Sequence, residues 1–314
     1  MTGIAKPFRE FVLDPVVNAS PALFMLRVSQ LLHERTGGRL DSRLQRLLGK
    51  PRASLPPASL MDDGAIDRSV EALHRRGWDV LPWRVDQAGI DMLRSFAFST
   101  PAYATDPHER VVIDAANPPR DHARYVWPIT DLIRVPAVQK LMTDSTLYKL
   151  AQNYLGYRPV LTSVTLWIDP VYDGSYNAHR YHYDNDGPGF LKFFIYVSDV
   201  DLESGAHSYI EGSHHHRKPE RFRRSQFYSR DDLVDFYGKQ SEIIFSAPAG
   251  TVIAEDTAGF HKGTTPRNSY RLLLQFQFAV IDIPHVEEFS SSIEKIKIER
   301  LDPSIKLIAR KFVA

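Results

Sequence analysis

Three segments in the second half of the chain have apolar residues at every second position, a pattern that restricts the fold more than any other feature. They are residues 163–168, 192–197 and 271–278. Successive side chains of a β-strand point to opposite faces, so each segment would have one wholly apolar face and one face of mixed polar and apolar residues. The apolar faces predict packing against helices. The mixed faces either line a polar cavity or meet water, as one face of an antiparallel sheet often does.

Further short β-rich segments, separated by Gly, Pro, Asp and Asn, surround these three from about residue 110 onward. Many short strands with turn signals between them are typical of a sandwich or barrel. A jelly roll with helices against one sheet is the natural member of that class. We therefore predict a mainly β fold with flanking helices. The expected strands are 110–115, 160–168, 191–199, 206–210, 242–246, 251–255 and 271–281.

The first sixty residues predict helices instead. Apolar residues recur at helical spacing in 22–33 and 40–48, and the segment 50–63 carries three prolines, as a linker would. We expect a helical N-terminal extension over 1–60 and the main domain over 61–314. The extension either packs on the main domain, which we favour, or lies on a membrane surface. Other expected elements are helices at 66–75, 85–98, 137–154 and 230–238 and a short strand at 77–81.

The amino-acid composition limits the kinds of functional site that the chain can form. The chain contains no cysteine, which excludes disulfides, thiolate metal sites and a cysteine nucleophile, so a metal site must use His, Asp, Glu or backbone oxygen. The 39 Lys and Arg residues nearly balance 38 Asp and Glu, which gives no argument for a nucleic-acid partner. No apolar run approaches the roughly 20 residues of a membrane span, and no signal peptide is evident. We expect a soluble cytoplasmic protein, of undetermined oligomeric state.

The densest chemical signal is the run Arg180-Tyr-His-Tyr-Asp-Asn-Asp186. Within a strand, His182 and Asp184 project to the same side, so both can reach one ion. His261, far downstream, is the candidate third ligand. Two His and one carboxylate on one face of an octahedron leave three open positions, the arrangement of non-haem Fe(II) oxygenases.

A 2-oxo acid with a distal carboxylate would also need a cation in the cavity. Arg271 begins a predicted strand on its mixed face, and a guanidinium can pair with a carboxylate through two parallel hydrogen bonds. Arg267 competes for this role, but it follows Pro266 in an expected turn and ranks second.

The stretch 182–278 resembles the phytanoyl-CoA dioxygenase family. After the His-x-Asp motif come LKFFIYVSDVD over 191–201, a Ser-Gly pair, and Glu-Gly-Ser-His over 211–214, where the family has Pro-Gly-Ser-His. Glu211 is thus a departure from the family pattern. The spacing from His261 to Arg271 also matches the family, whereas residues 1–60 fit no part of it.

This resemblance implies a double-stranded β-helix (jelly roll, cupin-like) core with Fe(II), 2-oxoglutarate and O₂. The expected reaction hydroxylates, or otherwise oxidises, an unactivated C–H bond while 2-oxoglutarate becomes succinate and CO₂. His182, Asp184 and His261 would be the catalytic iron ligands; the retained carboxylate argues against a halogenase. Relatives often place a second 2-oxoglutarate contact where Thr165 and Trp167 stand here.

Several residues keep two interpretations. Lys192 either reaches a carboxylate or is an exposed strand lysine. The histidines around 214–216 belong more naturally to a turn at the cavity rim than to a metal. The basic run 217–224 is either solvated surface or a lid for an anionic small-molecule substrate. The alternative function is a non-catalytic cupin-type protein that binds a metal and ligand; Arg271 argues against it.

Overall fold

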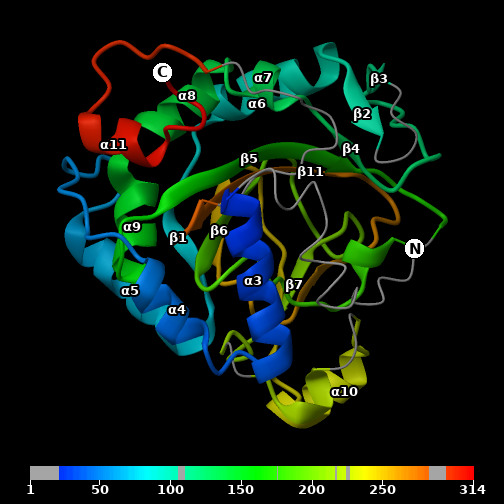
Figure 1. Cartoon of the computed structure of the whole chain (residues 1–314). Helices are drawn as coiled ribbons and strands as arrows, with labels where there is room; N and C mark the ends of the chain where they lie inside the picture. Colours follow the sequence, from blue (N-terminus) through cyan, green and yellow to red (C-terminus); the bar gives the residue numbers. More distant parts are fainter. Residues whose placement is uncertain (1–20, 105–109, 175, 216–217, 224–226, 283–294) are drawn as a thin grey trace.

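The computed structural model describes residues 21–104, 110–174, 176–215, 218–223, 227–282 and 295–314 (Figure 1). Its centre is an eight-stranded sheet in the order β1-β9-β6-β11-β5-β4-β2-β3, and a three-stranded sheet, β10-β7-β8, faces it. The strands of the large sheet are β1 (Trp78–Arg84), β2 (Ala102–Ala104), β3 (Arg110–Val111), β4 (Tyr125–Val126), β5 (Val160–Asp169), β6 (Phe190–Tyr196), β9 (Thr251–Glu255) and β11 (Arg271–Ala279). Those of the small sheet are β7 (His207–Ile210), β8 (Glu242–Phe245) and β10 (His261–Gly263).

The connections between the two sheets make the core a jelly roll. β5, β11, β6 and β9 lie side by side and antiparallel in the large sheet. The chain leaves this sheet after β5, after β6 and after β9, and each time it enters the small sheet before it returns. On the first visit it forms a single antiparallel bridge between His182 and His261, beside β10. This alternation is the double-stranded β-helix, and the predicted fold class is confirmed.

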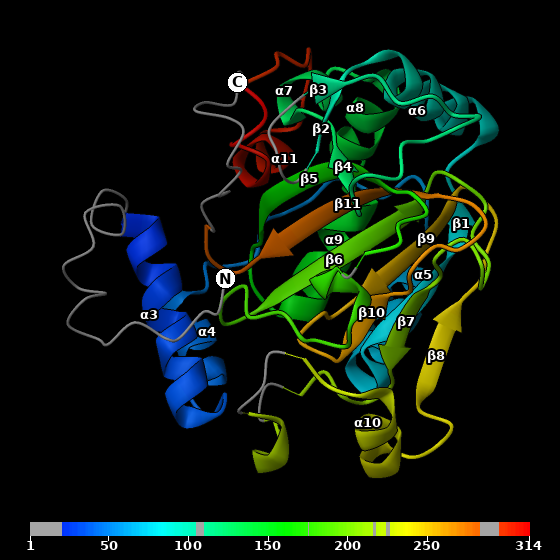
Figure 2. The same ribbon diagram turned by 90° about the vertical axis from the view of Figure 1, so that its right-hand side faces the viewer.

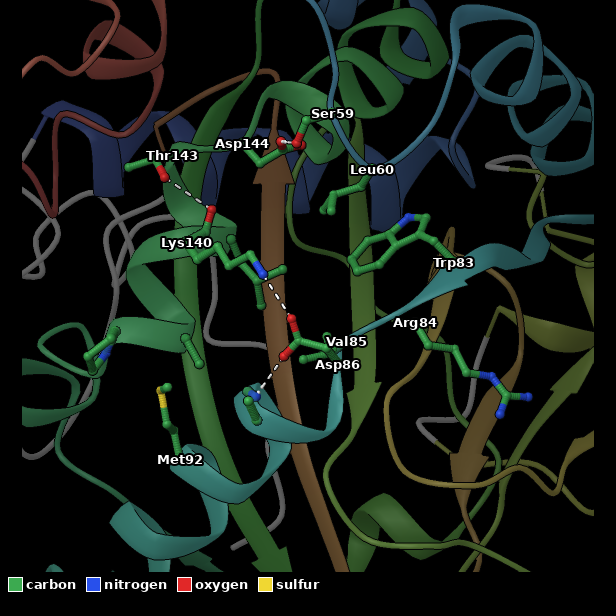
Figure 3. Close-up of a pocket in the computed structure, with 15 residues that line it drawn as sticks. Ser59, Leu60, Trp83, Arg84, Val85, Asp86, Met92, Lys140, Thr143 and Asp144 are labelled. Atoms are coloured by element: carbon green, nitrogen blue, oxygen red, sulfur yellow. Dashed lines mark hydrogen bonds and ion pairs between the residues drawn. The ribbon is translucent and has the colours of Figure 1, made fainter.

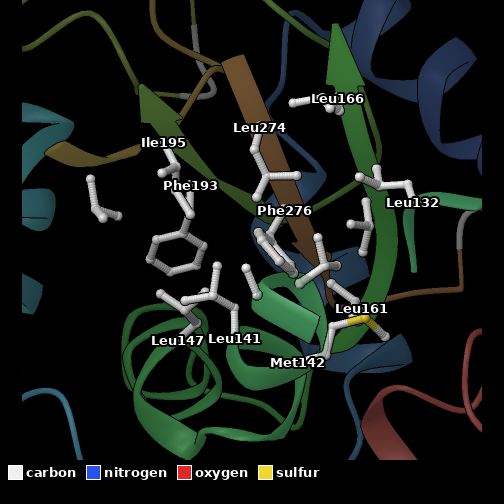
Figure 4. Close-up of a cluster of buried hydrophobic side chains, with 14 of the residues drawn as sticks. Leu132, Leu141, Met142, Leu147, Leu161, Leu166, Phe193, Ile195, Leu274 and Phe276 are labelled. Carbon is white, nitrogen blue, oxygen red and sulfur yellow. The ribbon is translucent and has the colours of Figure 1, made fainter. Parts of the chain in front are cut away.

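The apolar faces of the three alternating strands form the main core, as predicted. Leu166 of β5, Phe193 of β6 and Leu274 of β11 are fully buried in one cluster with residues of the covering helices (Figure 4). Leu141 and Leu147 reach this cluster from two successive helices. The other faces of the same strands turn toward the small sheet, where Trp167, Phe194 and Leu273 pack with Tyr209 and Phe245. The mixed faces therefore line the space between the sheets.

Helices cover the outer face of the large sheet and its ends (Figures 1 and 2). The expected helix 137–154 is interrupted at Asp144, whose side chain accepts a hydrogen bond from Thr146 N, so that one helix ends and a new one is capped. The other five predicted helical segments are confirmed within a few residues. The helices are α3 (Pro21–Thr36), α4 (Asp41–Leu48), α5 (Asp63–Arg76), α6 (Gln87–Ser99), α7 (Ile129–Leu132), α8 (Pro136–Thr143), α9 (Ser145–Leu155), α10 (Arg230–Tyr237) and α11 (Pro303–Ile308).

The strand predictions hold for the jelly-roll core and fail at its margin. The predicted strand 110–115 is wrong beyond Arg110–Val111, which pair only with the short β2. The strands β2, β4 and β10 were not predicted, because two or three residues carry no alternation that could reveal them. Among the described helices, none is long and apolar enough to cross a membrane.

The N-terminal helices α3 and α4 lie beside the ends of β6 and β11 (Figure 2). Gln30 of α3 donates a hydrogen bond of 2.7 Å to the carbonyl of Asn185. His33, at the end of α3, accepts or donates a buried 2.6 Å hydrogen bond with Asp41 of α4 and contacts the ring of Tyr183. The described part of the N-terminal segment thus packs against the loop that carries the His-x-Asp motif.

Candidate metal centre

Backbone pairing brings the three predicted ligands together. His182 N donates to His261 O at 3.1 Å, and His261 N donates to His182 O at 2.8 Å. Asp184 N is fixed in the same way by Thr257 O at 2.8 Å. The two histidines are distant in the sequence but directly opposed in the small sheet, so the sheet itself sets the distance between the ligands.

Both imidazoles are oriented for metal binding. His182 Nδ1 lies 2.8 Å from the carbonyl of Arg180, and His261 Nδ1 lies 3.0 Å from that of Gly259. Each Nδ1–H can donate to its carbonyl, which leaves each Nε2 as a free lone pair. The Nε2 atoms face the Asp184 carboxylate at 3.9 and 3.5 Å. One ligand atom from each of the three residues lies within 4.8 Å of the others, and no other described His, Asp or Glu forms such a group.

The electrostatics also suit a divalent cation. Burial holds the pKa of His261 well below its usual value, so this imidazole is neutral and can coordinate. Burial alone would raise the pKa of Asp184, but the nearby Lys192 ammonium outweighs it and holds that pKa below its usual range. Two imidazoles and one carboxylate form the donor set that Fe(II) oxygenases use. The residues present therefore fit the predicted metal.

Lys192 stands beside this triad rather than in solvent. Its Nζ lies 2.7 Å from Asp184 Oδ2 and 3.0 Å from Asp186 Oδ2, and the residue is only 8% exposed. Burial would lower the pKa of Lys192, but the two carboxylates raise it, so the side chain is an ammonium ion. The prediction that Lys192 reaches a carboxylate of the co-substrate stays untested; the carboxylates it contacts here belong to the protein.

Arg271 lies at the opposite, closed end of the space between the sheets. Its Nη2 is 2.5 Å from Asp169 Oδ2, and its Nη1 donates to the carbonyl of Gly205. Its Nε is fully buried and has no hydrogen-bond partner. The guanidinium fits closely under β10, because a Cβ on Gly263 would come within 2.1 Å of Nη2.

Arg124 shares the same carboxylate. Its Nε and Nη2 lie 2.6 and 3.0 Å from the two oxygens of Asp169. Burial would raise the pKa of Asp169, but the two guanidinium groups hold it below its usual range. Sequence reasoning missed both residues. Asp169 could have been found, since it continues the 163, 165, 167 face of β5, whereas no sequence signal pointed to Arg124.

The two remaining candidate co-substrate residues flank this cluster. Trp167 Nε1 lies 3.2 Å from Asp169 Oδ2, and the Arg124 guanidinium stacks on its ring at 4.6 Å. Thr165 Oγ1 is 2.9 Å from Ser163 Oγ on the same inner face. The indole N–H of Trp167 is thus engaged within the protein, while Thr165 remains half-buried between the sheets.

A buried pair next to the metal centre was also missed. His207 Nε2 lies 2.8 Å from Glu255 Oε2, and the His207 ring stacks on that of His261 at 5.7 Å. Burial lowers the pKa of His207 and raises that of Glu255, so both shifts favour the uncharged forms of the pair. Glu255 Oε1 is buried without a partner.

Other candidates lie apart from the centre. Arg267 is exposed, whereas Arg271 is buried. The preference for Arg271 as the partner of a co-substrate carboxylate therefore rests on the location of the two side chains as well as on the sequence. His214 is buried in the turn after β7 and hydrogen-bonds His74 O, and Glu211 accepts from the indole of Trp78 at 3.2 Å. Within the basic run, Lys218 is buried and donates to Ser213 O. His216, Arg217 and Arg224 lie outside the described residues.

A cavity of about 500 Å³ lies elsewhere, among β1, α6 and α8 (Figure 3). Leu60, Trp83 and Met92 line it together with the ion pair between Lys140 and Asp86, whose N–O distance is 2.9 Å. It contains none of the three metal-ligand candidates. We place the centre at the triad because metal binding depends on converging donor atoms.

No family model and no curated protein matches the sequence, so the resemblance to the phytanoyl-CoA dioxygenase family remains an expectation. Solved structures do match. HygX from Streptomyces hygroscopicus, with nickel and 2-oxoglutarate bound, is 17% identical over 76% of this chain and 93% of its own, with a TM-score of 0.48. EctD from S. alaskensis is 17% identical over 73% and 83%, also at 0.48. The α-ketoglutarate-dependent epimerase SnoN is 16% identical over 69% and 83%, at 0.47. At this similarity, the chemistry of this chain must be argued from its own residues.

Proposed function

We propose that this protein is an Fe(II)- and 2-oxoglutarate-dependent dioxygenase that hydroxylates, or otherwise oxidises, a C–H bond of a small molecule. The observation that carries the proposal is the triad of His182, Asp184 and His261, whose donor atoms converge within 4.8 Å on the inner wall of a jelly roll. When bound, Fe(II) with 2-oxoglutarate and O₂ supplies the oxidising chemistry, and the co-substrate leaves as succinate and CO₂.

The chain itself holds and orients these groups. The carbonyls of Arg180 and Gly259 fix the imidazole tautomers, so that both Nε2 atoms face the metal. The small sheet excludes water from His261, which is 5% exposed, while His182 and Asp184 remain partly open. A substrate would therefore approach from the side of His182 and Asp184.

We assign Arg271 to the distal carboxylate of 2-oxoglutarate. Two guanidinium groups share the single carboxylate of Asp169, which leaves one formal positive charge buried at the closed end. A buried charge without a counter-ion is costly, and a second carboxylate would neutralise it. The buried Nε of Arg271 has no partner in the protein and offers a donor for it. Thr165 lies on the same inner face and is proposed as a further contact, whereas Trp167 would act through its hold on Asp169.

The substrate is proposed only as a small molecule. A basic lid for an anionic substrate finds little support among the described residues of 218–223. Lys218 is buried, Arg221 lies 3.4 Å from Asp232, and Arg223 donates to Lys218 O.

An anaerobic titration of the metal-free protein with Fe(II) and 2-oxoglutarate tests the function. The expected result is a weak visible metal-to-ligand charge-transfer band that requires both ligands. Asp184→Ala should abolish it by loss of the metal, and Arg271→Ala should weaken 2-oxoglutarate binding without loss of the metal. A folded protein that binds iron but never develops the band would overturn the oxygenase proposal and favour the metal-binding cupin alternative.

A further inference from the structure

We propose that Lys192 is a positioning residue that restrains Asp184 to one metal-binding oxygen and, with Asp186, sets the affinity of the site for its metal. This inference rests on the proposed function. Lys192 Nζ contacts Asp184 through Oδ2 alone, at 2.7 Å. The other oxygen, Oδ1, lies 3.9 Å from His182 Nε2, whereas Oδ2 also lies 3.5 Å from His261 Nε2.

The restraint matters because a carboxylate can bind a metal through one oxygen or through two. Binding through one oxygen keeps three of six positions open, as a chelating 2-oxo acid and O₂ together require. Binding through both oxygens would occupy one of those positions. An ammonium on Oδ2 opposes the second mode, because Oδ2 would have to give up a charge-assisted hydrogen bond.

The restraint has a cost in metal affinity. A lysine ammonium at hydrogen-bond distance from a ligand carboxylate repels a dication bound to the same group. Asp186 offsets this repulsion, since its Oδ2 lies 3.0 Å from the same Nζ. One ammonium thus divides its attraction between a ligand and a carboxylate that is not a ligand.

The buried position of Lys192 keeps its ammonium in contact with the two carboxylates. The aliphatic stem lies on β6, where its neighbours in the sheet are Gln277 on β11 and Glu255 on β9. At 8% exposure, the ammonium has little access to water that could replace its two carboxylates. It therefore stays close to Asp184 whether or not the site is loaded.

The test compares Lys192→Met with the wild-type protein in two separate titrations. Fe(II) affinity is measured anaerobically by competition with a chelator, and 2-oxoglutarate affinity is then measured on the iron-loaded protein by the charge-transfer band. We expect Fe(II) to bind at least about tenfold more tightly and 2-oxoglutarate at least about tenfold more weakly, at the lower end of outer-shell effects on metal sites. Lys192→Arg should restore both constants toward the wild type.

Lys262→Met is the matched control, because Lys262 follows the ligand His261 but places its Nζ over the Tyr181 ring at 4.5 Å. It should leave both constants unchanged. Asp186→Asn gives an independent arm if Lys192→Met does not fold. It leaves the ammonium to Asp184 alone and should weaken Fe(II) binding.

The two proposals fail in different ways. If the wild-type protein shows no charge-transfer band, the proposed function fails. If the wild type binds both ligands but Lys192→Met weakens both, or changes neither, Lys192 has no restraining role. Unchanged Fe(II) binding in Asp186→Asn would overturn the shared-charge argument.

Discussion

The two ends of the space between the sheets carry opposite arrangements of charge. At the partly open end, one ammonium, Lys192, lies between two carboxylates, Asp184 and Asp186, for a formal sum of −1. At the closed end, one carboxylate, Asp169, lies between two guanidinium groups, Arg124 and Arg271, for a formal sum of +1. The first end suits a cation and the second an anion. A dianion that chelates the metal at one end and reaches Arg271 at the other would balance the charges of both ends.

The two ends also differ in whether the loss of a charged partner affects stability or binding. Asp169 has no exposed surface, whereas Asp184 is 20% exposed. Loss of a partner at the closed end leaves a charge in a dry environment, which destabilises the fold. At the open end, water or a metal ion can compensate the partly exposed Asp184 carboxylate for the loss of its partner.

Asp169→Asn should lower the free energy of unfolding by about 3–5 kcal/mol, because the buried Arg271 and the partly buried Arg124 lose their shared counter-ion. Urea denaturation at neutral pH measures it. Since the folded-state pKa of Asp169 is below its unfolded value of about 3.9, the difference from wild type should be complete above that pH and shrink as pH falls below it.

Asp282→Asn is the control for that prediction. Asp282 also lies between two cations, 2.9 Å from Arg310 and 2.8 Å from Lys311, but its side chain is 33% exposed. Its loss should cost less than about 1 kcal/mol. Equal losses in the two variants would break the proposed distinction between a closed and an open environment.

Gly263→Ala should act on the closed end alone. The new Cβ would meet the Arg271 guanidinium and displace it from Asp169, at a cost of about 1–3 kcal/mol in unfolding free energy. We expect weaker 2-oxoglutarate binding with Fe(II) binding retained, measured by the two titrations above. Loss of Fe(II) binding instead would mean that the two ends are not independent.

Glu255→Gln should change how the stability of the protein depends on pH. Because burial raises the folded-state pKa of Glu255, the wild-type protein loses stability as pH rises above the unfolded value of about 4.3. In chelator-treated protein, the variant should match the wild type near pH 4 and exceed it by more than about 1 kcal/mol at pH 8. A constant difference across this range would show that Glu255 is already ionised in the fold.

Gln30→Ala should have the smallest effect. It removes the hydrogen bond from α3 to the carbonyl of Asn185, between Asp184 and Asp186, and we expect a loss of about 0.5 kcal/mol in unfolding free energy. Thermal denaturation with and without Fe(II) measures it. Gln87→Ala, at an exposed pair with Asp91, is the control; a larger loss for Gln87→Ala would exclude a special role for α3.

Much of the core was predictable because its signals are local. The alternation in β5, β6 and β11 identified both faces of each strand, and Leu166, Phe193 and Leu274 lie in the predicted core. The helix break at Asp144 was missed because an N-cap inside an apolar helical pattern changes the helix without changing that pattern. The short strands at the sheet margin were missed because they exist through pairing alone.

The metal-ligand candidates could be predicted from the sequence alone, since a spacing of two within an extended segment puts His182 and Asp184 on one side. It also placed Arg271 and Lys192 on the mixed faces of their strands, and it left open whether Lys192 meets a carboxylate or solvent. What those cations contact depends on the tertiary structure. Asp169 lies 102 positions before Arg271 and 45 after Arg124, and no local pattern encodes pairs at such separations. The physical reason is that strand periodicity fixes the direction of a side chain, whereas the charge it meets is fixed by how the two sheets close over it.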